Sequence, residues 1–271
     1  MQRLSAKLAR PLVLVPTMGA LHDGHLALVK KAKRLSGRLG TTAASLFVNR
    51  MQFGPSEDFH EYPRTFQSDC RLLSSVKCDL VFAPEAEEMY FPDESTKVSE
   101  SELSTVMCGS SRPGHFAGVC TVVAKLLNIL RPDLAVFGEK DFQQLAIVRR
   151  MVRDLNFPVR IISHPTVRDQ DGLALSSRNR YLSPEERGQA AIINLTLQEA
   201  ERKIKAGWKT TDRLEDWMRS AISKQRLAKV DYVVAVHPVT LRRINHLIPP
   251  VLLAAAVYFG DTRLIDNRLI P

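Results

Sequence analysis

The sequence lacks paired cysteine motifs, a signal-peptide-like start and any long apolar run. Its four cysteines show no Cys-x-x-Cys spacing, which argues against a zinc site or a disulfide framework and favours reduced thiols. The longest apolar run, Val251 to Phe259, is far shorter than the roughly 20 residues that span a bilayer. The first ten residues have too little apolar content for a signal peptide. We therefore expect a soluble, cytoplasmic protein with no membrane partner.

Acidic residues are also fewer than basic ones, 29 against 38, which gives a formal net charge of +9 in 271 residues. Such an excess suits nucleic acid, an anionic small substrate, or simply a basic surface. The basic residues are scattered, with no long basic block and little aromatic interleaving, so we expect no nucleic-acid partner. A nucleic-acid-binding protein remains an alternative, and its binding would weaken steeply with salt and ignore ATP.

Strand-like and helix-like segments alternate through the first 164 residues, which predicts an α/β fold. Apolar runs predict strands over 11–15, 41–49, 79–83, 134–137 and 159–163. Helical patterns begin near residue 26 and after residue 62, and cover 115–130 and 142–155, while 84–114 reads as mostly loops. This alternation implies a parallel sheet with right-handed crossovers, which binds ligands at the carboxyl ends of its strands.

The pattern changes near residue 165, where we place a domain boundary between 1–164 and 165–271. A capping box with proline at the first helical position begins a helix at Ser183, and its pattern runs to about Lys205. A second helix is expected over 212–224, followed by β-rich stretches over 230–236, 251–259 and 261–266. The second part is therefore expected to be a smaller α+β domain.

His22 and His25 lie three residues apart where the first strand gives way to a helix. A glycine-containing turn before a helix N-terminus is a ready anion site, because free N–H groups and the helix dipole point at one spot. The plain alternative is that both histidines are surface or capping residues. A zinc site is disfavoured, since Asp23 and Gly24 stand where the usual helical zinc motif has glutamate.

Two further polar clusters have the composition of phosphate sites. Gly138, Lys140 and the pair Gln143 and Gln144 stand in a segment that follows a predicted strand and opens a helix. Two amides at a helix start can orient a small polar substrate. Ser176, Ser177 and Arg178 offer two hydroxyls and a guanidinium in a polar loop. Taken singly, each cluster is equally compatible with ordinary loop chemistry.

Taken together and in order, the motifs closely resemble the family of pantoate–β-alanine ligases, along nearly the whole chain. The matching segments are Pro16 to His25, Phe47 to Phe53, Tyr62 to Arg64, Ser111 to Phe116, Phe137 to Gln144, Asp171 to Asn179 and Gly260 to Asn267. The resemblance implies a Rossmann-like domain with a smaller C-terminal lid domain, assembled as a homodimer. It implies a step of pantothenate and coenzyme A biosynthesis. In that step pantoate is joined to β-alanine with ATP and Mg2+, through a pantoyl-adenylate, with release of pyrophosphate and AMP.

The family's site residues carry over by position. His25 matches the proton donor, with His22 as its catalytic neighbour. The implied ATP-binding residues are Met18, Gly19, Ala20, Leu21, His22, Asp23, Gly24, His25, Gly138, Glu139, Lys140, Asp141, Val167, Leu175, Ser176, Ser177 and Arg178. The implied pantoate and β-alanine residues are Gln52, Gln144, Asn49, Tyr62 and Arg112. Asp69 is expected near Mg2+.

The chain departs from the family pattern at Arg50, where proline is common, and at Phe142, where tyrosine is frequent. The proline position lies in the segment that carries Gln52. One alternative is a nucleotidyltransferase that keeps its adenylated product, and a release of AMP that depends on β-alanine would separate the ligase from it. Another is an inactive relative of the ligases.

Overall fold

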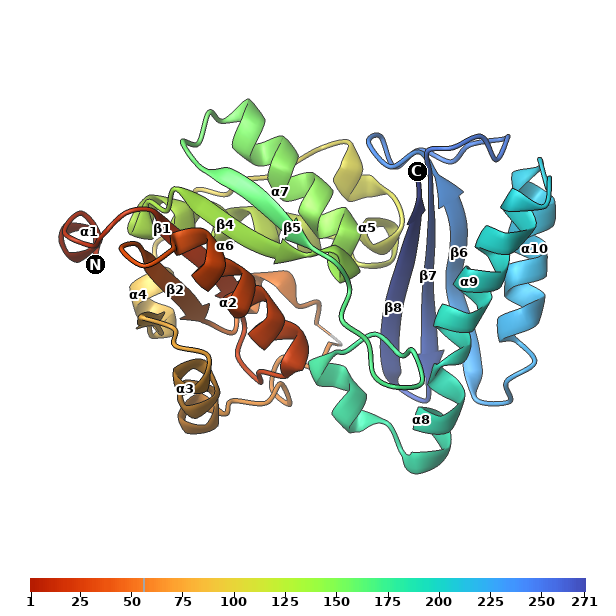
Figure 1. The fold of residues 1–271 in the computed structure, drawn as a ribbon, viewed down its shortest axis with the longest axis horizontal. Helices are drawn as coiled ribbons and strands as arrows, with labels where there is room; N and C mark the ends of the chain where they lie inside the picture. Colours follow the sequence, from red (N-terminus) through yellow and green to blue (C-terminus); the bar gives the residue numbers. More distant parts are fainter. Residues whose placement is uncertain (56) are drawn as a thin grey trace. The chain divides into compact units, whose positions relative to one another are not determined.

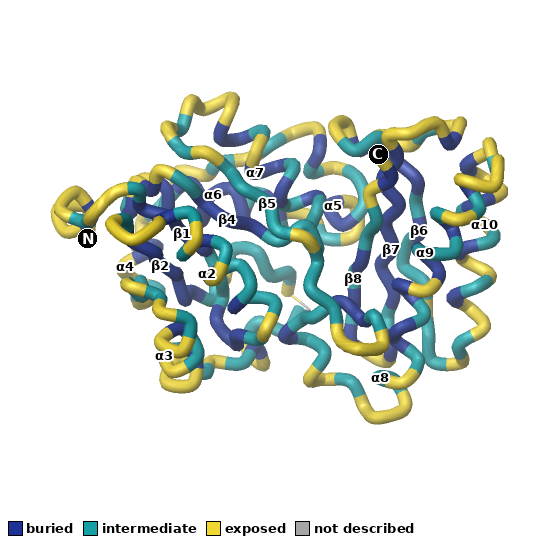
Figure 2. Tube along the Cα trace, in the orientation of Figure 1, coloured by how far each residue is buried: buried dark blue, intermediate teal, exposed yellow. Residues whose placement is uncertain are grey.

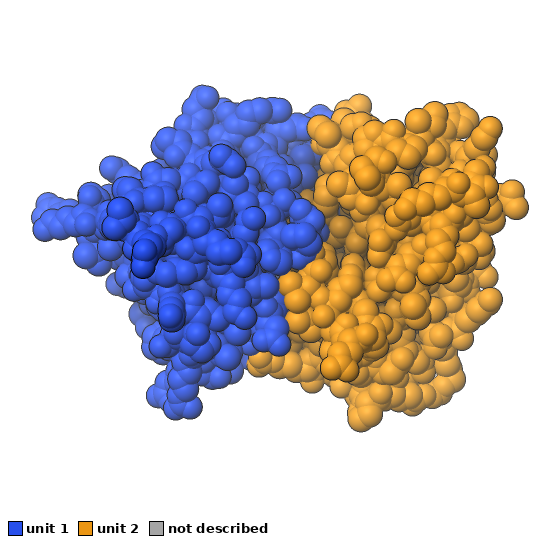
Figure 3. Space-filling view, viewed as in Figure 1, with its two compact units in different colours: residues 1–105, 109–139, 143–165 blue, residues 106–108, 140–142, 166–271 orange. Residues whose placement is uncertain are grey.

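The computed structural model describes residues 1–55 and 57–271, which cluster into two compact units (Figure 3). Unit 1 consists of Met1–Thr105, Gly109–Glu139 and Gln143–Pro165. Unit 2 consists of Val106–Cys108, Lys140–Phe142 and Thr166–Pro271. Within these described ranges, no helix has both the length and the apolar content needed to cross a bilayer.

Unit 1 is built on a parallel sheet, which in the described residues has five strands in the order β3-β2-β1-β4-β5 (Figure 1). The strands are β1 (Leu12–Thr17), β2 (Thr41–Leu46), β3 (Leu80–Phe82), β4 (Leu134–Gly138) and β5 (Arg160–His164). The helices are α1 (Gln2–Ser5), α2 (Asp23–Ser36), α3 (Phe66–Ser75), α4 (Ala86–Met89), α5 (Cys108–Ser111), α6 (His115–Leu130) and α7 (Phe142–Asp154). Short 3-10 turns are η1 (Arg50–Gln52), η2 (Leu103–Thr105) and η3 (Glu139–Asp141). The α/β prediction is confirmed, and the strand order is Rossmann-like.

The core of unit 1 explains why its strands read as continuous apolar runs. The four residues Leu12 to Val15 of β1 are fully buried, because the strand lies between β2 and β4 and is covered on both faces. Helix α2 packs on β1, β2 and β4, with Val29 and Ala32 in the same apolar cluster as Val13 and Val15. The apolar stripe predicted for this helix therefore faces the sheet.

The strand order reverses direction between β1 and β4. From β1 the chain builds outward through β2 and β3, and it returns to the other side of β1 as β4, with Val13 opposite Leu134. In open parallel sheets, ligands bind at such a switch point, outside the carboxyl ends of the two strands. The predicted histidine motif follows β1 and the Gly138 segment follows β4, so both begin at this switch point.

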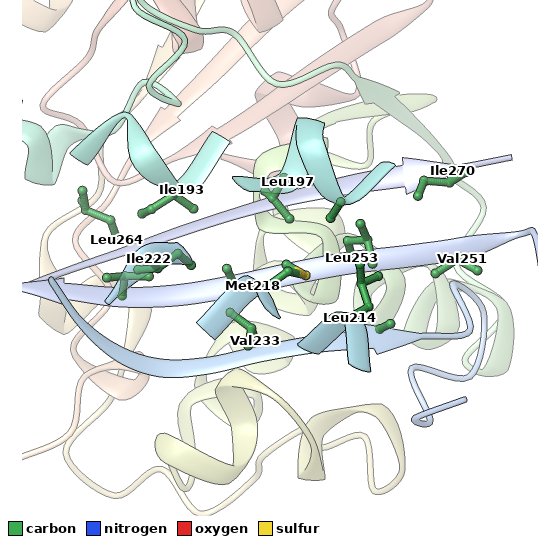
Figure 4. Close-up of a cluster of buried hydrophobic side chains, with 14 of the residues drawn as sticks. Ile193, Leu197, Leu214, Met218, Ile222, Val233, Val251, Leu253, Leu264 and Ile270 are labelled. Atoms are coloured by element: carbon green, nitrogen blue, oxygen red, sulfur yellow. The ribbon is translucent and has the colours of Figure 1, made fainter. Parts of the chain in front are cut away.

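Unit 2 contains an antiparallel sheet in the order β6-β7-β8, the only such sheet among residues 1–55 and 57–271. Its strands are β6 (Ala228–Val236), β7 (Val251–Phe259) and β8 (Thr262–Ile270). Its helices are α8 (Pro184–Ala190), α9 (Ile192–Lys205) and α10 (Thr211–Ile222), after the 3-10 turn η4 (Ser177–Tyr181). Apolar residues of α9, α10 and all three strands form its core (Figure 4), and β7 is buried almost throughout (Figure 2).

Several predicted boundaries were wrong. The single helix predicted from Ser183 to Lys205 is two helices, and the chain changes direction at Ala191 (Figure 1). Ala191 itself is no helix breaker, and the nearest glycine, Gly188, lies inside α8, so the sequence pattern did not place the break. Helix α2 begins at Asp23 rather than near residue 26, because His22 caps it, and β2 ends at Leu46 rather than at Asn49. The short helix α1 was not predicted.

Candidate active site

The loop between β1 and α2 is held by one buried carboxylate. Gly19 and Ala20 both have positive φ, 80° and 50°, so the chain turns sharply and directs successive N–H groups to one side. Asp69, which is 2% exposed, accepts hydrogen bonds from the backbone nitrogens of Ala20 at 3.0 Å and Leu21 at 2.9 Å. The Thr65 hydroxyl donates to the same carboxylate at 3.1 Å. Because its oxygens already accept these three bonds, Asp69 is better suited to fixing the turn than to the expected place beside Mg2+.

His22 and His25 stack at the start of α2, with their ring centroids 4.1 Å apart. His22 is the N-cap, and its Nδ1 accepts a hydrogen bond from the Gly24 nitrogen at 3.1 Å. The capping interpretation is therefore correct for Nδ1 of His22. It also fixes the tautomer, because an accepting Nδ1 leaves the hydrogen of the neutral ring on Nε2. The cap thus orients the Nε2–H donor of His22 beside the positive end of the α2 dipole.

The two glutamines in the segment after β4 lie in different environments. Gln143 is 5% exposed, and its Nε2 donates to the Leu103 carbonyl at 2.8 Å, so it serves the fold. Gln144 is half-buried and is the residue carried over for pantoate. Lys140 and Asp141 lie in η3 and cluster with unit 2, whereas Gly138, Glu139 and Gln144 cluster with unit 1.

The segment that carries Gln52 is clamped onto α6. Asn49 is 1% exposed, and its Nδ2 donates to the Gly118 carbonyl and to Oε1 of Gln52, each at 3.1 Å. The Tyr90 hydroxyl donates to Asn49 Oδ1 at 2.6 Å. A Cβ on Gly118 would lie 2.2 Å from the Met51 carbonyl oxygen, so only glycine lets the helix come this close. Asn49 therefore supports Gln52, and its expected contact with substrate stays a prediction.

Arg112, just before α6, also holds the Gln52 segment in place. Arg112 is paired with Glu57, with 2.6 Å between Nε and Oε1 and 2.5 Å between Nη2 and Oε2. Burial alone would raise the pKa of Glu57, but the hydrogen bonds and charge of Arg112 outweigh it and lower that pKa. Arg112 also donates to the Gln52 carbonyl at 3.3 Å. The guanidinium therefore positions the Gln52 segment, and its expected contact with substrate stays a prediction.

His115, the first residue of α6, also supports Gln52, and the sequence analysis did not select it. Its Nδ1 lies 2.7 Å from the Gln52 carbonyl, and its Nε2 lies 3.1 Å from Nη1 of Arg112. A carbonyl only accepts and a guanidinium only donates, so the geometry assigns a neutral ring with its hydrogen on Nδ1. The residue stands in the Arg112 to Phe116 motif, where the sequence analysis selected only the arginine.

Gln52, expected to bind pantoate, contacts Met18, expected to bind ATP. Nε2 of Gln52 donates to Sδ of Met18 at 3.1 Å. Unit 1 thus brings Gln52 to the start of the histidine loop. Tyr62 is 4% exposed and packs edge-on against Phe53, at 5.9 Å between ring centroids, so it stiffens the same segment from within.

The predicted residues after 165 form one local structure in unit 2. The Leu175 nitrogen donates to the Val167 carbonyl at 3.0 Å, which pairs two of the implied ATP-binding residues across a tight hairpin. Ser176 then caps η4 by accepting from the Arg178 nitrogen at 3.3 Å, and Ser177 is buried. Across the described ranges, no three His, Cys, Asp or Glu side chains are grouped so as to hold a metal ion.

Comparison with known proteins gives one family for nearly the whole chain. The family model for pantoate-beta-alanine ligase matches residues 1–269. The pantothenate synthetase of Thermoanaerobacter sp. (strain X514) is 50% identical over 268 residues, which cover 99% of this chain and 93% of the relative. That of Pseudothermotoga lettingae is 48% identical over 256 residues, covering 94% and 90%.

Solved structures show the same likeness. The crystal structure of pantothenate synthetase from Thermus thermophilus has a TM-score of 0.92 at 45% identity, covering 98% of this chain and 96% of that one. A pantoate-beta-alanine ligase from Francisella tularensis, complexed with beta-gamma ATP and beta-alanine, has a TM-score of 0.81 at 32% identity, covering 99% and 94%. This chain belongs to the pantoate–β-alanine ligase family.

Proposed function

We propose that this chain catalyses the ATP-dependent condensation of pantoate with β-alanine to give pantothenate, AMP and pyrophosphate. The observation that carries the proposal is the switch point of unit 1. The histidine loop follows β1 and the Gly138 segment follows β4, and these are the two adjacent strands at whose carboxyl ends a doubly wound sheet binds its ligand. The solved Francisella tularensis ligase was captured with a form of ATP and with β-alanine, which are two of the three substrates proposed here.

The first step is attack of the pantoate carboxylate on the α-phosphorus of ATP, with pyrophosphate leaving. Both reactants are anionic, so the enzyme must offset their repulsion and stabilise the charge that moves onto the phosphate oxygens. In our assignment His25 and His22 donate to the α-phosphate region, where the N-terminus of α2 adds its dipole. Lys140, Ser176, Ser177 and Arg178 are assigned to the rest of the triphosphate.

The second step is attack of the β-alanine amine on the acyl carbon of the pantoyl-adenylate. The carbon–nitrogen bond forms, the carbon–oxygen bond to the phosphate breaks, AMP leaves and the amine gives up a proton. Gln52 and Gln144 are assigned to pantoate, and Gln52 also to β-alanine. Orienting two small reactants in turn supplies much of the rate, because their loss of freedom occurs on binding rather than at the transition state.

We assign Mg2+ to the substrate, as the MgATP complex. Mg2+ prefers phosphate oxygens, waters and one or two carboxylates over a cage made wholly of protein groups. The residues around the β1–α2 loop fit that assignment, because the carboxylate of Asp69 is occupied by backbone N–H groups. We also propose that the enzyme is a homodimer and works in the cytoplasm.

Product analysis tests the function. The purified protein is incubated with ATP, Mg2+, pantoate and β-alanine, and each component is omitted in turn. We expect pantothenate and AMP in equal amounts only in the complete mixture, and pyrophosphate whenever ATP and pantoate are both present. AMP that forms at the same rate without β-alanine would count against the ligase. Sustained release of pyrophosphate with an adenylated product and no free AMP would instead favour a nucleotidyltransferase that keeps that product.

A further inference from the structure

Strand β8 contacts the backbone at Lys140 through one side chain. Nδ2 of Asn267 donates to the Lys140 carbonyl oxygen at 2.8 Å, across 127 positions of sequence. Both residues cluster in unit 2, where Lys140–Phe142 is a short segment separated in sequence from the rest. A hydrogen bond to the main chain fixes where the lysine side chain starts, whatever its own conformation.

The neighbouring residue, Asp266, holds the other predicted phosphate segment. It is 3% exposed and forms two hydrogen bonds with Arg168, at 2.6 Å to Nη1 and 2.9 Å to Nη2. Arg168 also donates to the Gly172 carbonyl at 3.1 Å and pairs with Ala174 across the hairpin. That hairpin leads directly into Ser176, and β8 packs against η4.

Side chains of adjacent strand residues point to opposite faces of the sheet. Asp266 and Asn267 therefore reach different segments, the hairpin at Arg168 and the backbone at Lys140. Their backbones are locked together, since Oδ1 of Asp266 also accepts from the Asn267 nitrogen at 2.8 Å. Opposite them on β7 stand Ala255 and Ala254, within the central strand of the sheet. The pair is therefore mounted on a rigid element.

We propose that Asp266 and Asn267 are positioning residues for ATP: Asn267 sets the Lys140 segment, and Asp266 sets the Ser176–Arg178 segment. The inference rests on the proposed function, which assigns Lys140, Ser176, Ser177 and Arg178 to the triphosphate. One strand thereby fixes the spacing between two segments that are far apart in sequence. Neither β8 residue touches ATP; both act through residues that do.

The test is Asn267→Asp, which keeps the size of the side chain but puts a carboxylate oxygen where an amide donates. We expect the KM for ATP to rise about tenfold, the scale of one lost hydrogen bond, with kcat changed less than about twofold. The KM for β-alanine and the thermal midpoint should stay near wild type. Leu269→Asn, on the same strand at an exposed position, is the matched control and should leave every parameter unchanged.

A double-mutant cycle separates positioning from general damage. If Asn267 acts through Lys140, then Asn267→Asp should add little to the KM for ATP of Lys140→Ala. Equal effects in both backgrounds, or a fall in kcat and thermal midpoint with the KM for ATP unchanged, would overturn the proposal. Asp266→Asn should likewise lose its effect on the KM for ATP in the Ser177→Ala background.

Calorimetric titration with a non-hydrolysable ATP analogue keeps the two proposals apart. A wild-type protein that binds the analogue but makes no pantothenate would refute the function, and the weakened binding of Asn267→Asp could still be measured. A fully active wild type whose Asn267→Asp variant binds the analogue equally well would refute only the positioning role.

Discussion

The two units fix their candidate site residues in different ways. In unit 1, helices supply the supports: Asp69 of α3 accepts from the β1–α2 loop, and His115 of α6 contacts the Gln52 carbonyl. In unit 2, one strand supplies both supports, through Asp266 and Asn267. Unit 1 therefore spreads its positioning over several independent elements, whereas unit 2 concentrates it on β8. We expect single substitutions to have separable effects in unit 1 and linked effects in unit 2.

The comparison also shows what the supports have in common. Asp69, His115 and Asn267 each bond to the main chain of the segment that carries the candidate residue. Asp266 differs, because it acts through the side chain of Arg168. Holding the main chain leaves the functional side chain available for substrate. Supports of this kind do not use up the side chains that would contact substrate. They do depend on contacts between segments that are far apart in sequence.

The largest expected effect is the loss of His25, the candidate proton donor in the loop that Asp69 holds. His25→Ala should lower kcat by at least about tenfold and up to about 1000-fold, the range for a lost proton or hydrogen-bond donor to a reacting group. Steady-state release of pyrophosphate measures it, with exposed His246→Ala as the control. Near-normal turnover would remove His25 from the reaction and leave the histidine loop without its assigned purpose.

The second effect concerns stability as well as activity. Asp69→Ala removes a buried acceptor from the Ala20 and Leu21 nitrogens, and should lower the free energy of unfolding by about 3 kcal/mol, since bonds to a charged group are strong. Urea unfolding measures the change. Asp23→Ala, an exposed carboxylate in the same motif, is the control for stability. If the two variants unfold at the same urea concentration, Asp69 does not support the loop.

A smaller effect is expected where α6 meets the Gln52 segment. Gly118→Ala puts a methyl group against the Met51 carbonyl, and the overpacking should cost about 1–3 kcal/mol and raise the KM for pantoate several-fold. Gly188→Ala is a matched control in α8, because a Cβ there meets nothing within 4 Å and should stabilise the helix by roughly 0.5–1 kcal/mol. A Gly118→Ala enzyme with unchanged pantoate kinetics would show that the clamp is not needed.

The smallest effect is expected at Arg50. This residue is the first of η1, where proline is well tolerated, and it makes a 3.9 Å ion pair with Glu94 from an exposed position. Arg50→Pro should change stability by less than about 0.5 kcal/mol and act mainly on substrate KM, by stiffening the Gln52 segment. Chemical unfolding and steady-state kinetics on one preparation measure both. A large loss of stability with unchanged KM would contradict this view of the loop.

The sequence predicted the α/β fold because buried parallel strands and amphipathic helices leave strong local patterns, and α6 was predicted residue for residue. It did not predict the break at Ala191, because the nearest glycine, Gly188, lies inside α8 rather than at the break. The motifs identified the candidate residues, but not the partners that hold Asn49, Asp69 and Arg112 in the fold. Those partners are Gly118, Ala20 and Glu57, and each lies 49 to 69 positions away in sequence.

The most direct test of the proposed chemistry follows the oxygen that the two steps transfer. Pantoate labelled with 18O in its carboxylate is converted with unlabelled ATP and β-alanine, and the products are analysed by mass spectrometry. Attack on the α-phosphorus followed by displacement of AMP predicts one labelled oxygen in each AMP formed. Label found in pyrophosphate or phosphate, or AMP without label, would contradict the adenylate route on which every residue assignment depends.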